Sequence, residues 1–389
     1  MKSAMKQVWI VVSTCLVLSM SIGSFTAFGL EISGKAALLM DSQSGRVLYE
    51  YNSTEKLPIA SITKLMTLII ILEAVERGEL SLADVVSTSP FAASKRGSRV
   101  WLETGEQLPL KEMLYAIAVG SANDAAVAVA EFAAGSEGEF VTLMNQKAHE
   151  LGLMDTTYAN STGLPTQENE TQVMTALDVA KLARYALTVP RMMEFVSTYE
   201  YTMRADSTKI PVLWNSNKLL RRYQGVDGLK TGFTTEAGYC MAATAERQDL
   251  RLIAVVLGSK TDGERESDIR ALLDYGFRKY HNYSVLRKDT TSGEIICITG
   301  QPYKMDVILA EDLCVTVERG KENEIATIVE INKNVTAPIK RGAAIGSITA
   351  LFEDEVLGRA PLTAAQDVEK ANLLTLMLRM THSMIEAVF

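Results

Sequence analysis

Ser61 and Lys64 form an S-x-x-K motif at the start of a long apolar segment, although residues 3–6 and 53–56 repeat this spacing. Three residues along an α-helix turn through about 300°, so the hydroxyl and the amine share one face and can interact. To act as a base at neutral pH, the amine must lower its pKa by roughly 3 units from about 10.4, which corresponds to about 4 kcal/mol. Burial favours the neutral amine and can supply this difference. The pair therefore predicts a serine nucleophile with a lysine base, near backbone N–H groups that can stabilise negative charge.

Two further motifs follow along the chain. Ser121 and Asn123 belong to its single S-x-N sequence, at a break between two helical stretches, and Lys230, Thr231 and Gly232 form its single K-T-G, on a strand-like segment. Taken separately, the first is also typical of a helix cap and the second of an ordinary turn. All three motifs in this order are much rarer than any one of them, which favours a shared catalytic cleft.

The rest of the composition narrows the chemistry. The chain has 389 residues with 39 Lys or Arg and 47 Asp or Glu, and the net charge of −8 argues against a nucleic-acid partner. Hydrophobic residues make up 47%, which supplies a sizeable core, and the length favours two domains. The four cysteines form no C-x-x-C pair and the three histidines no H-E-x-x-H, so neither a metal nor a cofactor is expected.

Residues 1–29 have the order of a secretory signal peptide. Lys2 and Lys6 precede an apolar run over residues 8–20, and small residues follow up to Gly29. Removal of this segment gives a mature charge of 37 − 47 = −10 and an exported protein. The alternative is a retained membrane anchor, although the apolar run is shorter than the roughly 20 residues of a membrane span.

The segments from residue 36 to about 280 predict an α+β fold, with an antiparallel sheet and helices packed around it. Residues 36–52 indicate two strands joined by a turn at Ser44 and Gly45, and residues 238–259 indicate another pair around Gln248 and Asp249. The apolar helix that carries Lys64 is expected to be buried and to end near Gly78. Further helical segments are 110–119, 124–134, 138–152 and 176–187. The first domain is therefore placed at 30–284.

The pattern of the sequence changes at about residue 285, from alternating helical and strand-like segments to short β-rich ones. Short β-rich runs with turns between them over 285–362 predict a small all-β sandwich as a second domain. Cys297 and Cys314 both lie in it, and they could pair outside the cell or simply be small apolar core residues. This alternative stays open at the level of the sequence.

Residues 363–389 predict a C-terminal amphipathic helix. Thr363 and Gln366 resemble a capping box at its start. The polar residues of the segment project onto one arc, and the wider arc is apolar, as in a helix that lies in a membrane interface. The alternative is a helix docked on its own domain. The polar arc consists of Asn372, Thr375, Arg379, His382, Ser383 and Glu386.

The order S-x-x-K, S-x-N, K-T-G is the combination found in penicillin-binding proteins and class A β-lactamases. The chain resembles the low-molecular-mass penicillin-binding proteins of the serine D-alanyl-D-alanine carboxypeptidase family. The resemblance extends over the phrases PIASITKLMT, VGSANDAAVAVAE and VDGLKTGFT, the β-rich second domain and the amphipathic tail. Phrases such as YCMAATAER and the overall length are most similar to sporulation-associated members.

The resemblance implies a peptidoglycan pentapeptide as substrate and β-lactams as inhibitors. Ser61 would attack the carbonyl of the penultimate D-alanine, with Lys64 as its base, and release the last D-alanine from an acyl-enzyme. Ser121 would relay protons toward the leaving amine, and Asn123 would position the substrate amide. The enzyme would act in the cell envelope, held at the outer face of the plasma membrane.

The same resemblance assigns the other side of the cleft. Lys230 would keep the local field positive, Thr231 would bind the substrate carboxylate, and the strand around Gly232 would pair with the peptide. The backbone N–H of Phe233 would complete an oxyanion hole with that of Ser61. The family places a carboxylate-binding arginine at the position of Arg265, which could equally be a solvated residue at a helix start.

The sequence departs from the family's usual residues at two positions, and two other functions are alternatives to the carboxypeptidase. Ala122 stands where many relatives have glycine, and Phe233 where some have histidine. A β-lactamase would use the same nucleophile, but the E-x-x-L-N element expected for fast deacylation in class A enzymes is absent from the sequence. A penicillin-binding wall sensor without turnover is the other alternative, although every reactive group is present.

Overall fold

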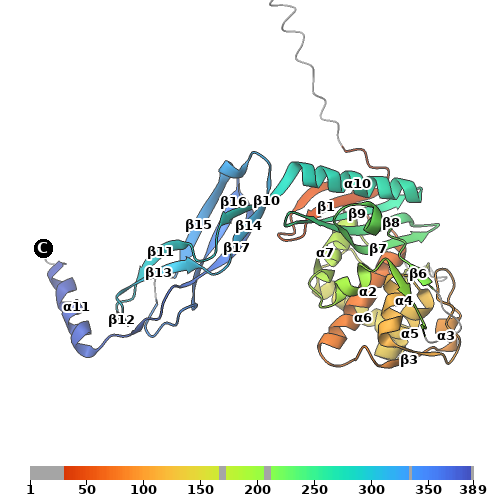
Figure 1. Cartoon of the computed structure of the whole chain (residues 1–389), viewed down its shortest axis with the longest axis horizontal. Coiled ribbons are helices and arrows are strands. Elements are labelled where there is room, and N and C mark those ends of the chain that lie inside the picture. The colour runs from red at the N-terminus through yellow and green to blue at the C-terminus, as the bar shows by residue number, and fades with distance from the viewer. Residues whose placement is uncertain (1–29, 166–171, 206–211, 333–334, 387–389) are drawn as a thin grey trace, which may run out of the picture. The chain divides into compact units, whose positions relative to one another are not determined.

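The computed structural model describes residues 30–165, 172–205, 212–332 and 335–386, so the predicted signal peptide lies outside the described residues. A five-stranded antiparallel sheet runs in the order β2-β1-β9-β8-β7. Its strands are β1 (Ala36–Asp41), β2 (Val47–Tyr51), β7 (Val226–Thr234), β8 (Gly238–Arg247) and β9 (Leu250–Ser259). One face is covered by α10 (Asp262–Lys279) and the other by helices that include α7 (Ala176–Ala186) (Figure 1). Burial from both sides explains why β1 and β9 are nearly continuous apolar runs.

The helical layer surrounds α2 (Lys64–Glu76), which is buried on almost every side, as its sequence predicts. Gly78 follows its end with a φ of 73°, a left-handed conformation that glycine adopts without strain. The other helices of this part are α3 (Pro90–Ala93), α4 (Leu110–Ala118), α5 (Asn123–Ala134), α6 (Glu137–Glu150), α7 (Ala176–Ala186), α8 (Met192–Val196) and α9 (Leu219–Arg222). Two short strand pairs lie among them, namely β3 (Val85–Ser87) with β4 (Gln107–Pro109) and β5 (Glu200–Thr202) with β6 (Val212–Trp214).

The predicted α+β architecture of this part is confirmed. The β1–β2 hairpin turns at Gly45, with a φ of 80°, and the β8–β9 pair turns at Gln248 and Asp249, with φ values of 49° and 60°. The four further helical segments correspond to α4, α5, α6 and α7.

The β-rich part has a second five-stranded sheet, in the order β11-β13-β17-β16-β15, together with the pairs β10-β14 and β12-β18. It has its own apolar core, which includes Val307, Val315, Ile348 and Leu362. Its strands are β10 (Tyr280–Leu286), β11 (Thr291–Ile296), β12 (Gly300–Gln301), β13 (Lys304–Leu309), β14 (Leu313–Glu318), β15 (Ile325–Ile331), β16 (Ala344–Phe352), β17 (Glu355–Ala364) and β18 (Glu369–Lys370). A short 3-10 helix, η2 (Glu322–Glu324), precedes β15.

The C-terminal helix begins later than predicted. Thr363 lies in β17, where it pairs with Ile308 and Ala344, so it is not a helix cap. From Ala360 to Ala364, alternate residues of β17 are buried, and this period of two marks a strand. Helix α11 (Leu373–Glu386) instead starts after Asn372, whose Oδ1 accepts a hydrogen bond from Thr375 N at 2.8 Å.

Three cysteines lie in the described residues, and none of them is paired. Cys240 and Cys297 are buried, and Cys314 is partly exposed. The disulfide alternative for Cys297 and Cys314 is therefore wrong in this structure, and Cys297 is a small core residue of the β-rich part. Within the described ranges, no helix has both the length and the apolar character needed to span a bilayer.

Candidate active site

Ser61 lies in η1 (Ala60–Thr63), a 3-10 turn that leads directly into α2. Its side chain is partly exposed, whereas Lys64, at the first position of α2, is completely buried. The Lys64 Nζ atom lies 2.9 Å from Ser61 Oγ. The sequence spacing thus brings an accessible hydroxyl into hydrogen-bonding distance of a buried amine.

The surroundings of Lys64 favour its neutral form. Burial holds the pKa of this amine well below its usual range, and the positive charge of Lys230 lowers it further. Nζ donates to Asn123 Oδ1 at 2.6 Å and to the carbonyl of Thr162 at 2.7 Å. Because both partners are acceptors, they occupy the two N–H bonds of a neutral amine and leave its lone pair for the Ser61 hydroxyl proton.

Asn123, at the first position of α5, is fixed in this orientation. Its Nδ2 donates to the carbonyl of Arg96 at 2.6 Å, so Oδ1 must be the atom that faces Lys64. Its backbone N–H donates to the carbonyl of Ser98 at 2.7 Å. The S-x-N asparagine therefore ties the loop at residues 96–98 to the lysine.

The second lysine of the site, Lys230 on β7, contacts the other S-x-N residue. Its Nζ donates to Ser121 Oγ at 2.9 Å and to the carbonyl of Thr231 at 3.2 Å. Burial, reinforced by the charge of Arg265, lowers the pKa of Lys230 to about 7. Ser121 has a φ of 55°, an uncommon conformation for a residue with a side chain, and such strain is frequent at functional positions.

Strand β7 passes directly against Ser61. A Cβ on Gly232 would lie 2.7 Å from the carbonyl oxygen of Ile59 and 3.0 Å from the backbone nitrogen of Ser61. This close approach explains the glycine of the K-T-G motif. The hydroxyl of Thr231 is hydrogen-bonded to that of Ser216. The Phe233 ring, which is 54% exposed, packs at an interplanar angle of 34° against Tyr239, with ring centroids 4.3 Å apart.

Arg265 is not a solvated residue, although it lies in the first turn of α10. It is 3% exposed and forms an ion pair with Asp262, and its Nη1 donates to the carbonyl of Cys240 at 3.5 Å. Its buried Nε has no hydrogen-bond partner among the residues that the structure describes. Cys240 is the β8 partner of Gly232, so the bond to its carbonyl places the guanidinium beside the K-T-G strand, and its charge lowers the pKa of Lys230.

Sequence reasoning missed the turn that supplies the Thr162 carbonyl. Asn160 Oδ1 accepts from Thr162 N at 3.1 Å and from Gly163 N at 2.7 Å, which shapes the turn. A Cβ on Gly163 would lie 1.9 Å from the carbonyl oxygen of Ala60. The sequence N-S-T-G at 160–163 has turn-forming residues, but the sequence alone does not show that this turn lies against Ser61.

The fold and site define a serine hydrolase of the penicillin-recognising class, in which a buried lysine contacts the serine. A family model described as D-alanyl-D-alanine carboxypeptidase matches residues 24–261, and one described as penicillin-binding protein 5, C-terminal domain, matches residues 280–370. The chain belongs to this D-alanyl-D-alanine carboxypeptidase family and is a serine-type peptidase.

Curated relatives extend the similarity over most of the chain. The D-alanyl-D-alanine carboxypeptidase DacF of Bacillus subtilis is 38% identical over 346 residues, which cover 89% of this chain and 88% of that protein. The D-alanyl-D-alanine carboxypeptidase DacC of Escherichia coli is 33% identical over 362 residues, again with 89% and 88% covered.

Solved structures show the same fold. Penicillin-binding protein 5 of Haemophilus influenzae superposes with a TM-score of 0.73 at 28% identity and covers 87% of this chain and 98% of its own. Penicillin-binding protein D2 of Listeria monocytogenes, in its ampicillin-bound form, has a TM-score of 0.56 at 34% identity and covers 64% of this chain and 99% of its own.

Proposed function

We propose that the enzyme removes the terminal D-alanine of peptidoglycan stem pentapeptides through an acyl-enzyme on Ser61. Lys64 takes the hydroxyl proton of Ser61, and Oγ attacks the carbonyl of the penultimate D-alanine. The peptide C–N bond breaks as the leaving amine receives a proton along the Ser121 side of the cleft, and water then hydrolyses the ester.

The observation that carries this proposal is the bonding of Lys64. Its two acceptor-only partners, Asn123 Oδ1 at 2.6 Å and Thr162 O at 2.7 Å, direct its lone pair to a hydroxyl 2.9 Å away. Burial and the charge of Lys230 both lower the pKa of Lys64 and so favour its neutral form. The sequence has only three histidines, and this arrangement needs none of them.

The other predicted residues have roles in substrate binding under this proposal. Lys230 and Arg265 provide positive charge for the terminal carboxylate, and Thr231 provides a hydroxyl. Strand β7 is at the edge of the sheet, so the segment around Gly232 can pair with an extended peptide. The backbone N–H groups of Ser61 and Phe233 would form the oxyanion hole.

β-Lactams would acylate the same serine, because their ring amide mimics the scissile amide. The ampicillin-bound structure of the Listeria protein supports this part of the proposal. We further propose an envelope location after signal-peptide removal at about residue 29, with α11 resting on the membrane surface. A role in sporulation stays a prediction from the sequence resemblance.

Benzylpenicillin labelling followed by peptide mass spectrometry tests the proposal, together with D-alanine release from a pentapeptide. We expect the label on Ser61, loss of both activities in Ser61→Ala, and at least about 100-fold slower labelling in Lys64→Met. Ser53→Ala, in the other S-x-x-K of the mature chain, is the matched control and should behave as wild type.

Other outcomes would point to the rival functions. Rapid and repeated hydrolysis of benzylpenicillin would indicate a β-lactamase. A stable label on Ser61 without release of D-alanine would indicate a wall sensor, and a label on any other residue would contradict the mechanism.

A further inference from the structure

The turn at residues 160–163, which binds Lys64, is hydrogen-bonded to two helices through Ser161, and Ser161 is fully buried. Thr67, on α2 one turn beyond Lys64, donates its hydroxyl to the carbonyl of Ser161 at 2.8 Å. The Ser161 N–H and hydroxyl donate to Glu137 Oε1 at 3.0 and 2.7 Å. Every polar group of Ser161 is thus fixed by a neighbouring helix, and the Thr162 carbonyl follows next along the chain.

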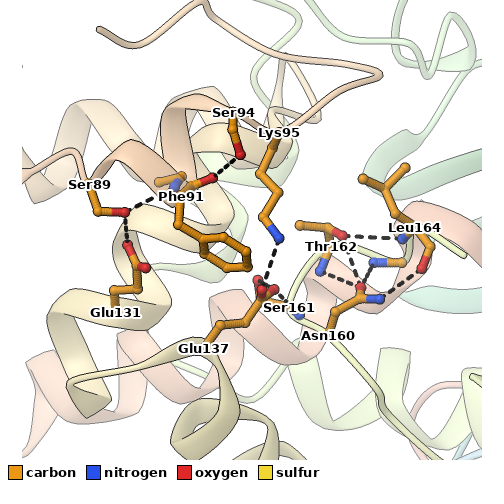
Figure 2. A network of polar contacts seen from close by, with 12 residues as sticks. Ser89, Phe91, Ser94, Lys95, Glu131, Glu137, Asn160, Ser161, Thr162 and Leu164 are labelled. Carbon is orange, nitrogen blue, oxygen red and sulfur yellow. Dashed lines mark hydrogen bonds and ion pairs between the residues drawn. The ribbon is translucent and has the colours of Figure 1, made fainter. Parts of the chain in front are cut away.

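Glu137, in the first turn of α6, has a second partner behind the turn. Its Oε2 atom lies 3.2 Å from Lys95 Nζ, and the side chains of Lys95 and Glu137 are only 19% and 11% exposed. The Lys95 ammonium also lies 3.6 Å from the centroid of the Phe91 ring. Figure 2 shows the resulting chain of contacts from Lys95 through Glu137 to Ser161, beside the turn around Asn160.

We propose that Glu137 is a positioning residue for the serine–lysine pair. Glu137 binds Ser161 and so fixes the turn whose Thr162 carbonyl accepts a hydrogen bond from Lys64. Glu137 and Lys95 together also determine the net charge on this side of the Lys64 amine. The inference rests on Lys64 being the base, as in the proposed function. It adds a carboxylate and a lysine that none of the three sequence motifs contains.

The charges that face Lys64 give this proposal a direction. Burial and Lys230, on β7, lower the pKa of Lys64, whereas Asp124, on α5, and Glu137, on α6, raise it. Lys95 opposes Glu137 directly at 3.2 Å. Removing the carboxylate should therefore lower the pKa of Lys64, and removing Lys95 should strengthen the carboxylate's effect and raise it.

The test is the pH dependence of the second-order rate constant for acylation by benzylpenicillin, measured on the full mature chain. Acylation requires neutral Lys64, so its acid limb follows the pKa of that amine. We expect the limb to move to lower pH in Glu137→Gln and to higher pH in Lys95→Met, each by about 0.5 to 1 pH unit. Below the limb, this is about a threefold to tenfold change in rate.

Glu139→Gln is the matched control, because it removes the same charge from the same first turn of α6 at an exposed position. Its acid limb should coincide with that of the wild type. If Glu137→Gln does not fold, as judged by circular dichroism, Lys95→Met carries the test, since Lys95 is hydrogen-bonded to Glu137 and leaves the bonds between Glu137 and Ser161 in place.

If Ser61 is labelled but the acid limbs of Glu137→Gln and Lys95→Met do not shift, or shift in the same direction, the inference is wrong. A wild-type protein that is not labelled at Ser61 would overturn the proposed function and this inference with it. The two failures are therefore distinguishable in one set of samples.

Discussion

Lys64 and Lys230 are both buried, yet their hydrogen bonds suit different tasks. Lys64 faces two carbonyl-type acceptors and a serine hydroxyl, which is the environment of a base. Lys230 faces the Ser121 hydroxyl and the carbonyl of Thr231, and its pKa is lowered to about 7. Near neutral pH Lys230 therefore changes charge, and the binding of an anion should change with it.

Substrate binding is predicted to weaken as the pH rises above 7. Below this value Lys230 is an ammonium ion that attracts the terminal carboxylate, and above it the neutral amine does not. If the proton is obligatory, the affinity falls by up to about tenfold per pH unit. Calorimetric titration of the Ser61→Ala variant with a D-alanyl-D-alanine peptide from pH 6 to 9 measures binding without turnover.

A peptide that ends in D-alaninamide is the control for this titration. It lacks the carboxylate, so its weaker binding should not vary with pH through Lys230. A dissociation constant for the acid peptide that stays level from pH 6 to 9 would contradict the prediction.

For individual residues, the sequence predicted contacts within one continuous helical segment better than contacts between segments that are distant in the chain. Ser61 and Lys64 are three residues apart, so helical geometry alone brings them together. Thr162 and Glu137 reach the site from elements that are distant in the chain, and nothing in their local sequence indicates it. Arg265 was left between two interpretations because burial is a property of the fold.

Among the elements, the turn at 160–163 depends on a glycine that touches η1. Gly163 has a φ of 87°, and a Cβ there would lie 1.9 Å from the carbonyl oxygen of Ala60. Gly78, after α2, has a similar φ of 73°, but a Cβ at this position would meet no atom of the described part of the chain within 4 Å. Both positions thus require a left-handed backbone conformation, but only Gly163 also lacks space for a side chain.

Gly163→Ala is predicted to damage both stability and acylation. Gly78→Ala should lose only the cost of a left-handed alanine, about 1–2 kcal/mol in the free energy of unfolding. Gly163→Ala should lose at least about 2 kcal/mol more, because the turn must separate from η1. Its labelling by benzylpenicillin should be at least about tenfold slower, since the Thr162 carbonyl moves with the turn.

Urea unfolding and labelling kinetics of the two variants check this difference. Equal losses of stability in Gly163→Ala and Gly78→Ala, with equal labelling rates, would show that the contact with Ala60 has no consequence.

The elements themselves followed from sequence where a periodic pattern was long. Helix α2 and the β8–β9 pair were placed closely, because their apolar runs end at clear turn residues. The end of the β-rich part was misjudged, since Thr363 and Gln366 imitate a capping box while strand pairing takes Thr363 into β17. Local helix signals lose to sheet pairing when the alternate residues are buried.

In the whole molecule, α11 presents different sides to protein and solvent. Arg379 donates to the carbonyls of Ile298 and Gly300 at 2.9 and 2.6 Å and lies 4.6 Å from the ring centroid of Tyr303. This contact ties the helix to the β-rich part through a polar residue. Among the side chains of α11 that the structure describes, up to Arg379, four apolar ones are more than half exposed, namely Leu373, Leu374, Met377 and Leu378. The docked alternative therefore accounts for Arg379 but not for the exposure of these four side chains.

The exposed apolar side of α11 is predicted to bind lipid. Burial of one leucine in an apolar medium contributes about 1.5–3 kcal/mol, so Leu374→Ser with Leu378→Ser should weaken vesicle binding by about 100-fold or more. D-Alanine release from a soluble pentapeptide should be unchanged, because neither residue belongs to the site. Val356→Ser, at an exposed apolar position on β17, is the control and should bind as wild type. Cosedimentation of the mature chain with anionic phospholipid vesicles measures the effect. Undiminished sedimentation of the double variant would contradict the prediction.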